Sequence, residues 1–447
     1  MVDIWSPKGK VIAERRLWVA VLEAQQALGV EVPEGVVEAY RSAIEQVDLE
    51  SIRQRELLTR HDVKARIEEF CVLAGHEHIH KAMTSRDLTE NIEQLQVFNS
   101  LRLVCNKMVA LVCQLGQHAD AYADLVMVGR THNVAAQATT LGKRFANFGN
   151  EALIGLDRLE GLLGRYQFRG LKGPVGTQQD LLELFGGDER KINELESRVS
   201  ADMGFAEVLT SVGQVYPRSL DYDVVSALVQ ASSASANLAK AIRLMAGHGL
   251  IVEGFQDGQV GSSAMPGKRN ARTCERICGL TAVVQGYADM VASLVGDQWN
   301  EGDVSCSVVR RVALPGAFLA LDGQLEAALV VLSELSVCPD EIAVELRANL
   351  PALCATRVLL AAIAGGSGRE EAHRIVSEHV PKADGFFAAV VADERLPLGE
   401  QEVERIRSDP LALAGAASAQ ARAFANRAKT LAAENLDIVY YSPESIL

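Results

Sequence analysis

No proline occurs between Pro33 and Pro174. Proline interrupts helices because it lacks an amide hydrogen and its ring collides with the preceding turn. Its absence over residues 34–173 therefore favours long, uninterrupted helices. Inside this stretch, apolar residues recur at the three- and four-residue steps of one helical face. These residues are Leu95, Val97, Leu101, Val104, Met108, Leu111, Val112 and Leu115.

Further segments show the same helical spacing of apolar residues. They are residues 134–167, 219–251, 272–296 and 303–336. Apolar residues cover much of the circumference of these later segments, as is typical of helices inside a bundle. Aromatic residues make up only 5% of the chain, which suits close helix-on-helix packing. We therefore predict an all-α protein with three helical domains: residues 1–92, a central long-helix bundle over residues 93–340, and residues 341–447.

Charge and cysteine usage limit the classes of protein to consider. The net charge of −14 argues against broad binding of nucleic acid or anionic membranes. The eight cysteines form no Cys-x-x-Cys pair, so neither a zinc knuckle nor a redox dithiol is indicated. We find no signal-peptide pattern at the N-terminus and no charge-free apolar run of membrane-span length. We expect a cytoplasmic protein with no nucleic-acid or membrane partner.

One loop, Gly261-Ser-Ser-Ala-Met-Pro-Gly-Lys-Arg-Asn270, combines features that suit chemistry on an anion. Its small residues permit backbone movement, and two hydroxyls lie near two cations. A hydroxyl beside positive charge can act on an anionic substrate under a closing lid. On composition alone, an ordinary surface turn with a basic edge is favoured.

Two other segments carry chemistry-bearing side chains. His132 lies in Gly129-Arg-Thr-His-Asn-Val-Ala-Ala-Gln137, although a lone histidine is more often structural than catalytic. The sequence Thr84-Ser-Arg-Asp87 follows histidines at positions 76, 78 and 80. Alternating histidines share a face only in an extended segment, so a metal site there is weakly supported.

Taken together, these segments resemble the boxes of a known family. The run Ser-Ser-Ala-Met-Pro-x-Lys-Arg-Asn resembles the signature loop of the adenylosuccinate lyase branch of the fumarase/aspartase superfamily. The segment around His132 resembles its Gly-Arg-Thr-His box, and Thr84-Ser-Arg-Asp87 its Thr-Ser-x-Asp box. The resemblance covers nearly the whole chain, from Ile4 to about His379. It implies a fumarate-releasing carbon–nitrogen lyase that uses no metal or cofactor. It also implies a homotetramer whose twenty-helix core has active sites shared between three subunits.

The resemblance implies a role for each matching residue. Ser262 takes the role of base, His132 that of general acid, and Lys268 stabilises the intermediate. Glu275 matches the glutamate that orients the histidine, and Arg310 resembles a phosphate or base contact. The residues matched to substrate binding are Arg60, His61, His80, Thr84, Ser85, Thr131, Gln214, Ser263, Met265, Asn270, Arg276, Ser307 and Arg311.

The sequence departs from the family at positions near the nucleotide. Relatives usually carry an Arg-Tyr pair before the segment that starts here at Met1. Gly267 stands where histidine or tyrosine is usual, Ala271 replaces a common proline, and Gly302 replaces a frequent arginine. Two substrates follow as alternatives. One is adenylosuccinate, with the succinylcarboxamide ribotide of purine synthesis. The other is a smaller non-nucleotide N-succinyl compound such as hydrazinosuccinate. A catalytically inactive scaffold is disfavoured because the predicted base and acid are both retained.

Overall fold

Helices make up most of the described chain. The structure, a computed structural model, describes all residues except 255–263, 266, 440 and 444–447. Over the described residues it contains nineteen α-helices and is 69% helical, which confirms the predicted all-α class. Two small antiparallel ladders are added: β1 (Val126–Thr131) with β2 (Val134–Thr140), and β3 (Ile251–Val252) with β4 (Ser336–Val337).

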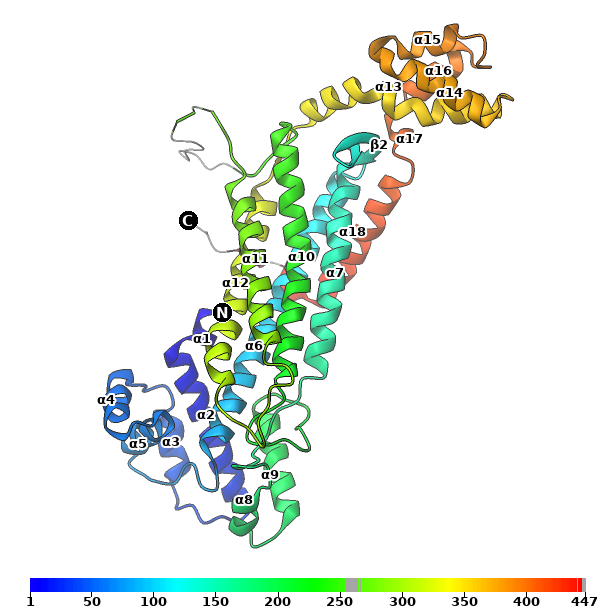
Figure 1. Cartoon of the computed structure of the whole chain (residues 1–447). Coiled ribbons are helices and arrows are strands. Elements are labelled where there is room, and N and C mark those ends of the chain that lie inside the picture. Colours follow the sequence, from blue (N-terminus) through cyan, green and yellow to red (C-terminus); the bar gives the residue numbers. More distant parts are fainter. Residues whose placement is uncertain (255–263, 266, 440, 444–447) are drawn as a thin grey trace. The chain divides into compact units, whose positions relative to one another are not determined.

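The chain forms two compact units, each built from separate segments. Unit 1 comprises Met1–Cys105, Asp157–Gln230 and Ala282–Gly323, and unit 2 comprises Asn106–Leu156, Ala231–Thr281 and Gln324–Leu447. Five long helices, labelled in Figure 1, each contribute residues to both units. These helices are α6 (Ser85–Ala121), α7 (Leu141–Gly164), α10 (Ser219–Gly247), α11 (Arg272–Ala292) and α12 (Cys306–Glu334). The predicted domain boundaries after residues 92 and 340 stay a prediction.

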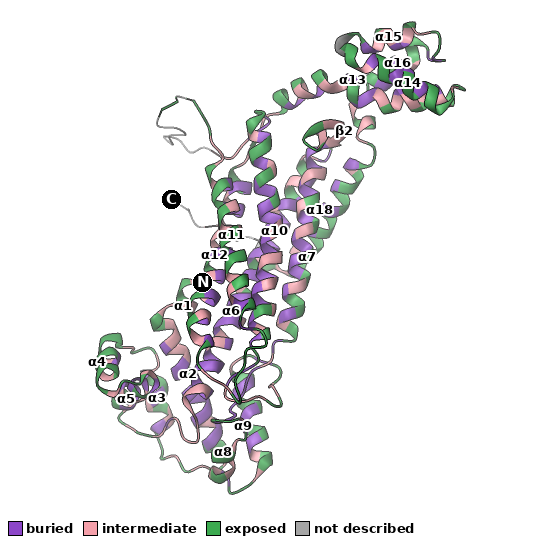
Figure 2. Ribbon diagram, viewed as in Figure 1, coloured by how far each residue is buried: buried purple, intermediate pink, exposed green. Residues whose placement is uncertain are grey.

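The predicted apolar faces coincide with buried residues on these helices (Figure 2). Leu101, Met108 and Leu111 of α6 are fully buried, as are Val225 and Leu228 of α10. Leucine, methionine and valine at helical spacing fill such an interior without polar groups that would need partners. The helices predicted over residues 219–251, 272–296 and 303–336 are therefore confirmed, with ends within a few residues of those expected.

The helix predicted over residues 134–167 is wrong at its start. Residues 134–140 form β2, which pairs with β1, and α7 begins only at Leu141. The turn residues His132 and Asn133 have φ angles of 52° and 64°, which a tight two-residue hairpin requires. Thr140 then accepts a hydrogen bond from the Lys143 amide at 3.1 Å, as a helix cap does. Pairing between distant backbone groups, which apolar spacing does not reveal, decides this segment.

Aromatic side chains from three of the remaining helices of unit 1 pack together. Trp18 and Phe70 stack with ring centroids 6.1 Å apart, and Tyr40 packs edge-on against Phe70 at 4.9 Å. In Figure 1, α3, α4 and α5 lie together in this unit. The remaining helices of unit 1 are α1 (Val2–Trp5), α2 (Pro7–Ala27), α3 (Val36–Ala43), α4 (Leu49–Thr59), α5 (Asp62–Ala74), α8 (Gln179–Leu184) and α9 (Glu189–Asp202).

In unit 2, helix α13 (Pro339–Ala364) packs against both the β1–β2 hairpin and a separate cluster of short helices. Phe386, Val390 and Ile375 are fully buried in that cluster. The short elements of the cluster are α14 (Arg369–His379), the 3-10 helix η1 (Val380–Gly385), α15 (Phe386–Ala392) and α16 (Glu400–Arg407). The chain continues through α17 (Pro410–Leu413) to α18 (Ala417–Glu434), which lies against α6 and α7, and ends with α19 (Leu436–Val439).

Two helices, α12 and α13, have the length and apolar composition of a membrane span, although neither holds a charge-free run of that length. Each has a window of mean hydropathy 1.4. In α12, 61% of this window is buried inside the protein, as in the core helix of a soluble protein. In α13, 28% is buried.

Candidate active site

His132 lies at the exposed tip of the β1–β2 hairpin in unit 2. A left-handed φ is costly for a residue with a side chain, and such residues gather at functional sites. The hairpin is anchored beside the turn, because Arg130 donates from Nη2 to Glu345 Oε1 of α13 at 2.5 Å. Thr131, also predicted to bind substrate, is exposed on the same turn. The structure therefore presents His132 on a fixed support with its ring free to meet a ligand.

The predicted base lies outside the described residues. Ser262 and Ser263 fall in the segment 255–263, while Met265, Lys268 and Asn270 are described. Met265 and Lys268 are exposed, and the Lys268 amide donates to the Met265 carbonyl at 3.4 Å. The loop leads into α11, whose first amides, Thr273 and Cys274, donate to the Glu253 carboxylate at 2.8 Å each.

A cavity of about 720 Å³ lies beside this loop in unit 2. We call it the loop cavity. The described residues that line it include four cations and one carboxylate, Glu275, whose Oε1 lies 4.0 Å from Arg243 Nη2. The excess of positive charge suits an anionic substrate. Its lining residues are Lys240, Arg243, Leu244, Ala246, Gly247, Lys268, Arg269, Asn270, Ala271 and Glu275.

The structure thus brings Lys268, Asn270 and Glu275 together at one cavity. Arg276, the next residue of α11, is exposed. The described residues form no hydrogen bond or ion pair between Glu275 and His132. Their predicted pairing, for which the resemblance invokes neighbouring subunits, stays a prediction.

In unit 1, the Thr-Ser-x-Asp box begins helix α6. The Thr84 amide donates to Asp87 Oδ2 at 2.8 Å, the reciprocal half of a capping box. This bond fixes Thr84 and Ser85 at the N-terminus of a 37-residue helix. Helix N-termini favour anions because their amides lack partners and the helix dipole is positive there. Thr84 and Ser85 are both half-buried.

Asp87 is completely buried and links this box to a distant segment. Its Oδ1 accepts from Arg169 Nη1 at 2.7 Å and from the Lys172 amide at 2.9 Å. Arg169, also completely buried, donates from Nη2 to the Gly213 carbonyl at 3.1 Å. A buried charge needs such partners because water is absent. Asp87 and Arg169 therefore hold Thr84-Ser85 and Gly213-Gln214 in one arrangement.

Gln214 is further tied to the segment that leads to Ser307. The backbone amide of Gln214 donates to the Glu301 carbonyl at 2.7 Å. A side chain on Gly213 would place Cβ 2.1 Å from that carbonyl oxygen, so the close approach requires glycine. The predicted segments around residues 84 and 214 thus lie together with Glu301, which precedes Ser307 in the chain. Ser307 is half-buried near the start of α12.

Arg310 does not offer its guanidinium to a phosphate. It is buried and donates from Nε to Asp221 Oδ2 at 2.7 Å and from Nη1 to Glu93 Oε2 at 2.5 Å. A third hydrogen bond reaches the Tyr216 hydroxyl. Arg311, by contrast, is exposed. The resemblance of Arg310 to a phosphate contact is therefore replaced by a structural role, and Arg311 remains as the accessible cation.

His80 is held as a neutral donor. Its Nδ1 accepts from Trp18 Nε1 at 3.1 Å. Burial lowers the pKa of His80 to about 4, although Asp87 opposes the shift. The proton of the neutral ring therefore lies on Nε2, which can donate to a substrate carboxylate. The neighbouring histidines have other contacts, since His78 Nδ1 lies 3.1 Å from Lys81 Nζ, and the described residues hold no cluster that could bind a metal.

Arg60 and His61 form the link between α4 and α5. Arg60 has a φ of 50° and ends α4, and His61 Nδ1 accepts from the Lys64 amide at 3.3 Å as the cap of α5. Both side chains are exposed. Capping accounts for His61 locally, and the exposed Arg60 guanidinium is the group of this pair that could reach an anion.

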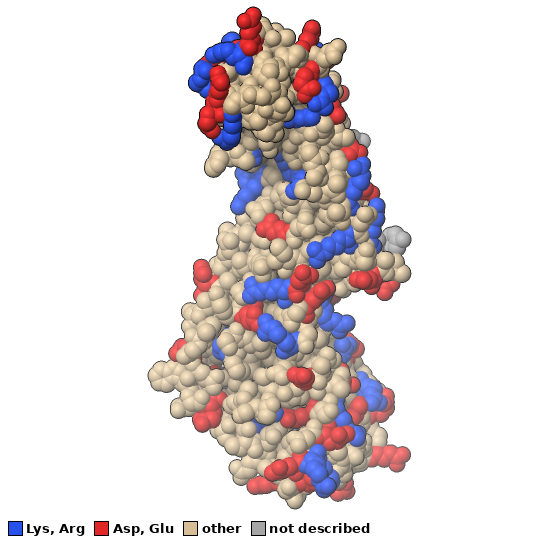
Figure 3. Space-filling view, turned by 90° about the vertical axis from the view of Figure 1, so that its right-hand side faces the viewer, with Lys and Arg blue, Asp and Glu red and all other residues tan. Residues whose placement is uncertain are grey.

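Sequence reasoning missed residues that support the site. Arg169 and Lys172 lie in Arg-Gly-Leu-Lys, which has no motif character by itself. Lys240 and Arg243 lie three apart on α10 and so share a helical face, a signal that could have been noticed. Figure 3 shows that both signs of charge are interspersed over the face in view, so surface charge alone does not mark the site.

Comparison with known proteins agrees with this arrangement. A family profile described as "Lyase" matches residues 8–286. Adenylosuccinate lyase from Saccharomyces cerevisiae is 33% identical over 416 residues, 92% of this chain and 85% of that protein. The adenylosuccinate lyase of Schistosoma mansoni is 32% identical over 387 residues, 86% of this chain and 81% of that protein.

Solved structures share the fold. The fumarate lyase from Mesorhizobium sp. BNC1 matches with a TM-score of 0.82 at 22% identity, covering 95% of this chain and 96% of that one. A 3-carboxy-cis,cis-muconate lactonizing enzyme from Pseudomonas putida also gives 0.82, at 20% identity and 96% coverage of both chains. The chain belongs to the adenylosuccinate lyase family of the fumarase/aspartase superfamily.

Proposed function

We propose that this protein is a carbon–nitrogen lyase that releases fumarate from adenylosuccinate and from the succinylcarboxamide ribotide of purine synthesis. The observation that carries the proposal is the loop cavity, where Lys268, Asn270 and Glu275 meet three further cations. A substrate with two carboxylates needs such an excess of positive charge in a protein of net charge −14. The relatives named adenylosuccinate lyase support the choice of substrate.

The proposed reaction is a β-elimination. Ser262 removes a proton from the carbon next to a carboxylate, and Lys268 stabilises the doubly charged intermediate. The carbon–nitrogen bond then breaks as the double bond of fumarate forms, and His132 gives a proton to the leaving nitrogen. Thr84 and Ser85, at the N-terminus of α6, suit a substrate carboxylate. His80 would donate from Nε2 to the same group.

The proposed active form is a homotetramer with shared sites. Its support is apolar surface on the long helices. Val308, Val312 and Leu319 of α12 are 70%, 51% and 41% exposed and recur on one helical face. Val283 of α11 is 45% exposed. Side chains of this kind on adjoining turns are typical of a surface that a further subunit covers.

A smaller N-succinyl substrate, such as hydrazinosuccinate, is the second candidate. It is favoured because fewer cations are available near the predicted position of a nucleotide phosphate. Arg310 is committed to carboxylates, and Gly302 has a φ of 144°, which disfavours the arginine found in many relatives. Gly267 also has no side-chain ring that could pack against a nucleobase. Each missing hydrogen bond to a charged phosphate lowers affinity by about 1.5–3 kcal/mol.

Fumarate absorbance with purified protein tests both substrates. Under the proposal, adenylosuccinate and the ribotide are cleaved with higher kcat/KM than hydrazinosuccinate, and the reverse order selects the second candidate. Ser262→Ala is expected to lower kcat by on the order of 10²–10⁴ without changing the fold. The control, Ser293→Ala, alters an exposed serine that only donates to the Met290 carbonyl. No turnover of any N-succinyl compound by intact oligomer would reject the proposal.

A further inference from the structure

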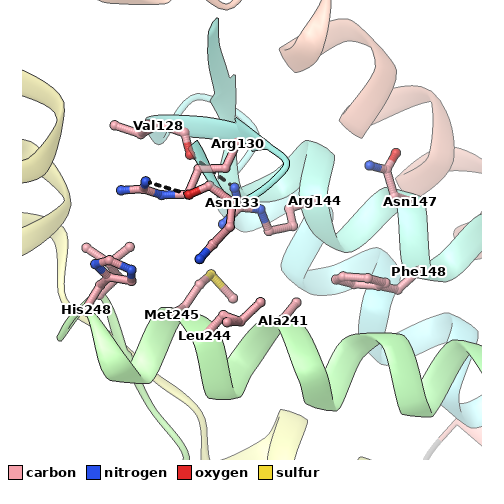
Figure 4. Close-up of a pocket in the computed structure, with 11 residues that line it drawn as sticks. Val128, Arg130, Asn133, Arg144, Asn147, Phe148, Ala241, Leu244, Met245 and His248 are labelled. Carbon is pink, nitrogen blue, oxygen red and sulfur yellow. Dashed lines mark hydrogen bonds between the residues drawn. The ribbon is translucent and has the colours of Figure 1, made fainter. Parts of the chain in front are cut away.

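A second cavity of unit 2, of about 610 Å³, lies between the β1–β2 hairpin and the C-terminal part of α10. We call it the hairpin cavity. In Figure 4, Arg130 and Asn133 lie on the hairpin side, Met245 and Leu244 lie on α10, and His248 directly follows the end of that helix. None of these residues is among those matched to substrate. The cavity therefore needs an explanation of its own.

Arg144 of α7 gives this cavity an incompletely neutralised cation. Its Nη2 donates to the Val128 carbonyl at 3.1 Å, which is its one hydrogen bond within the described part of the chain. No carboxylate among the described residues lies within 4 Å of the guanidinium, and burial lowers the pKa of Arg144 while the charge of Glu345 partly opposes this. A guanidinium withdrawn from water is stabilised by an anion.

The charge of the hairpin cavity sets the charge of its ligand. Arg130 is already paired with Glu345 at 2.5 Å, so this pair contributes no net charge. Among the described arginine and carboxylate side chains here, Arg144 then leaves one net positive charge. A monoanion matches this balance, whereas a phosphate dianion exceeds it. The flat fork of a guanidinium fits both oxygens of a carboxylate.

Apart from Asn147, the remaining wall of the hairpin cavity is apolar. Phe148 lies on the α7 side, and Leu244 and Met245 lie on α10 (Figure 4). Leu244 is 58% exposed, which is unusual for a large apolar side chain that lines a cavity. Ligand cavities commonly combine such walls with a few polar groups that fix orientation.

We infer that the hairpin cavity binds a monocarboxylate with an apolar body, whose carboxylate meets Arg144 and whose body packs on Phe148, Leu244 and Met245. The ligand would contact the hairpin that carries His132, which gives it a route to influence the predicted acid. The inference does not depend on the proposed activity, because binding is measured without turnover.

Isothermal titration of the full-length protein with 3-phenylpropionate tests this inference. The neutral isostere 3-phenylpropan-1-ol is expected to bind the unmodified protein about 10- to 100-fold more weakly than the acid does. The Arg144→Met variant is expected to bind 3-phenylpropionate more weakly by the same factor, because a charged hydrogen bond is lost in each case. Arg198→Met is the matched control. Arg198 is an exposed arginine paired with Glu194 in unit 1, and its loss should leave Kd unchanged.

A second variant tests the inference even if Arg144→Met fails to fold. Met245→Trp fills the hairpin cavity and keeps the guanidinium, so it should abolish binding while circular dichroism stays unchanged. Equal affinity for the acid and the alcohol, undiminished binding by Met245→Trp, or no binding of 3-phenylpropionate to the unmodified protein would each overturn the inference. Inorganic phosphate binding as tightly as the acid would also overturn it, because the apolar wall would then have no role.

Discussion

The two units hold their predicted site residues in opposite ways. In unit 1, the boxes around residues 84 and 214 are fixed by the completely buried pair Asp87 and Arg169. In unit 2, His132 and Lys268 are exposed, and His132 has a left-handed backbone. Groups that only bind can be fixed in advance by buried bonds, whereas groups that exchange protons must face the substrate. The contrast therefore lies between the boxes around residues 84 and 214, which buried bonds hold in place, and the exposed His132 and Lys268.

The largest expected effect sharpens this contrast in unit 2. His132→Gln should lower kcat by on the order of 10²–10⁴, because the leaving nitrogen loses its proton donor. Thermal unfolding should keep its midpoint, since the side chain is exposed at a turn. Steady-state fumarate release and a thermal scan check both statements, with His373→Gln, an exposed histidine of α14, as the control. A large fall in the midpoint would show that His132 is structural.

In unit 1, the matching test is Asp87→Asn. Losing one member of a buried ion pair leaves Arg169 uncompensated and should cost about 3–5 kcal/mol of unfolding free energy. KM should rise as well, because Thr84 and Gln214 lose their common support. Urea unfolding measures the first effect.

The control for Asp87→Asn is Glu194→Gln, which breaks an exposed pair with Arg198 and should cost about 0.3–0.5 kcal/mol. Similar costs for the two variants would mean that the Asp87 network does not fix the unit 1 boxes.

Alanine substitutions of two glycines, one in each unit, allow a finer comparison of the units. Gly213→Ala should destabilise by about 1–3 kcal/mol, because its Cβ would meet the Glu301 carbonyl. Gly267→Ala in the loop meets nothing within 4 Å and carries only the cost of a φ of 78°, about 1 kcal/mol. Urea unfolding of both variants ranks them. If Gly267→Ala were the more damaging, the contrast between the close backbone approach at Gly213 and the open space at Gly267 would be wrong.

The last prediction concerns the pH dependence of stability in unit 1. The lowered pKa of His80, about 4, means that folded protein binds fewer protons than unfolded protein between pH 4 and 6.5. Stability should therefore fall as pH drops from 6.5 to 4, by at most about 1.4 kcal/mol per pH unit from this residue. His80→Gln should remove that part of the slope in urea unfolding at stepped pH. An unchanged slope would indicate that the ring is not withdrawn from water.

Several features followed from the sequence alone. The proline-free stretch and helical spacing predicted the long helices, because backbone geometry and apolar burial act locally along the chain. The motifs identified the family for the same reason, since Thr84, His132 and Lys268 lie in short runs whose residues can be compared directly.

Tertiary structure decided what depends on distant residues. Residues 134–140 became a strand because residues 126–131 pair with them, and Arg310 became structural because Asp221 and Glu93 surround it. The bonds of Asp87 to Arg169, the approach of Glu301 to Gly213 and the two cavities of unit 2 likewise have no local signal. Apolar periodicity reports which face of a segment is buried, but hydrogen-bond and charge partners are chosen only when separate segments meet.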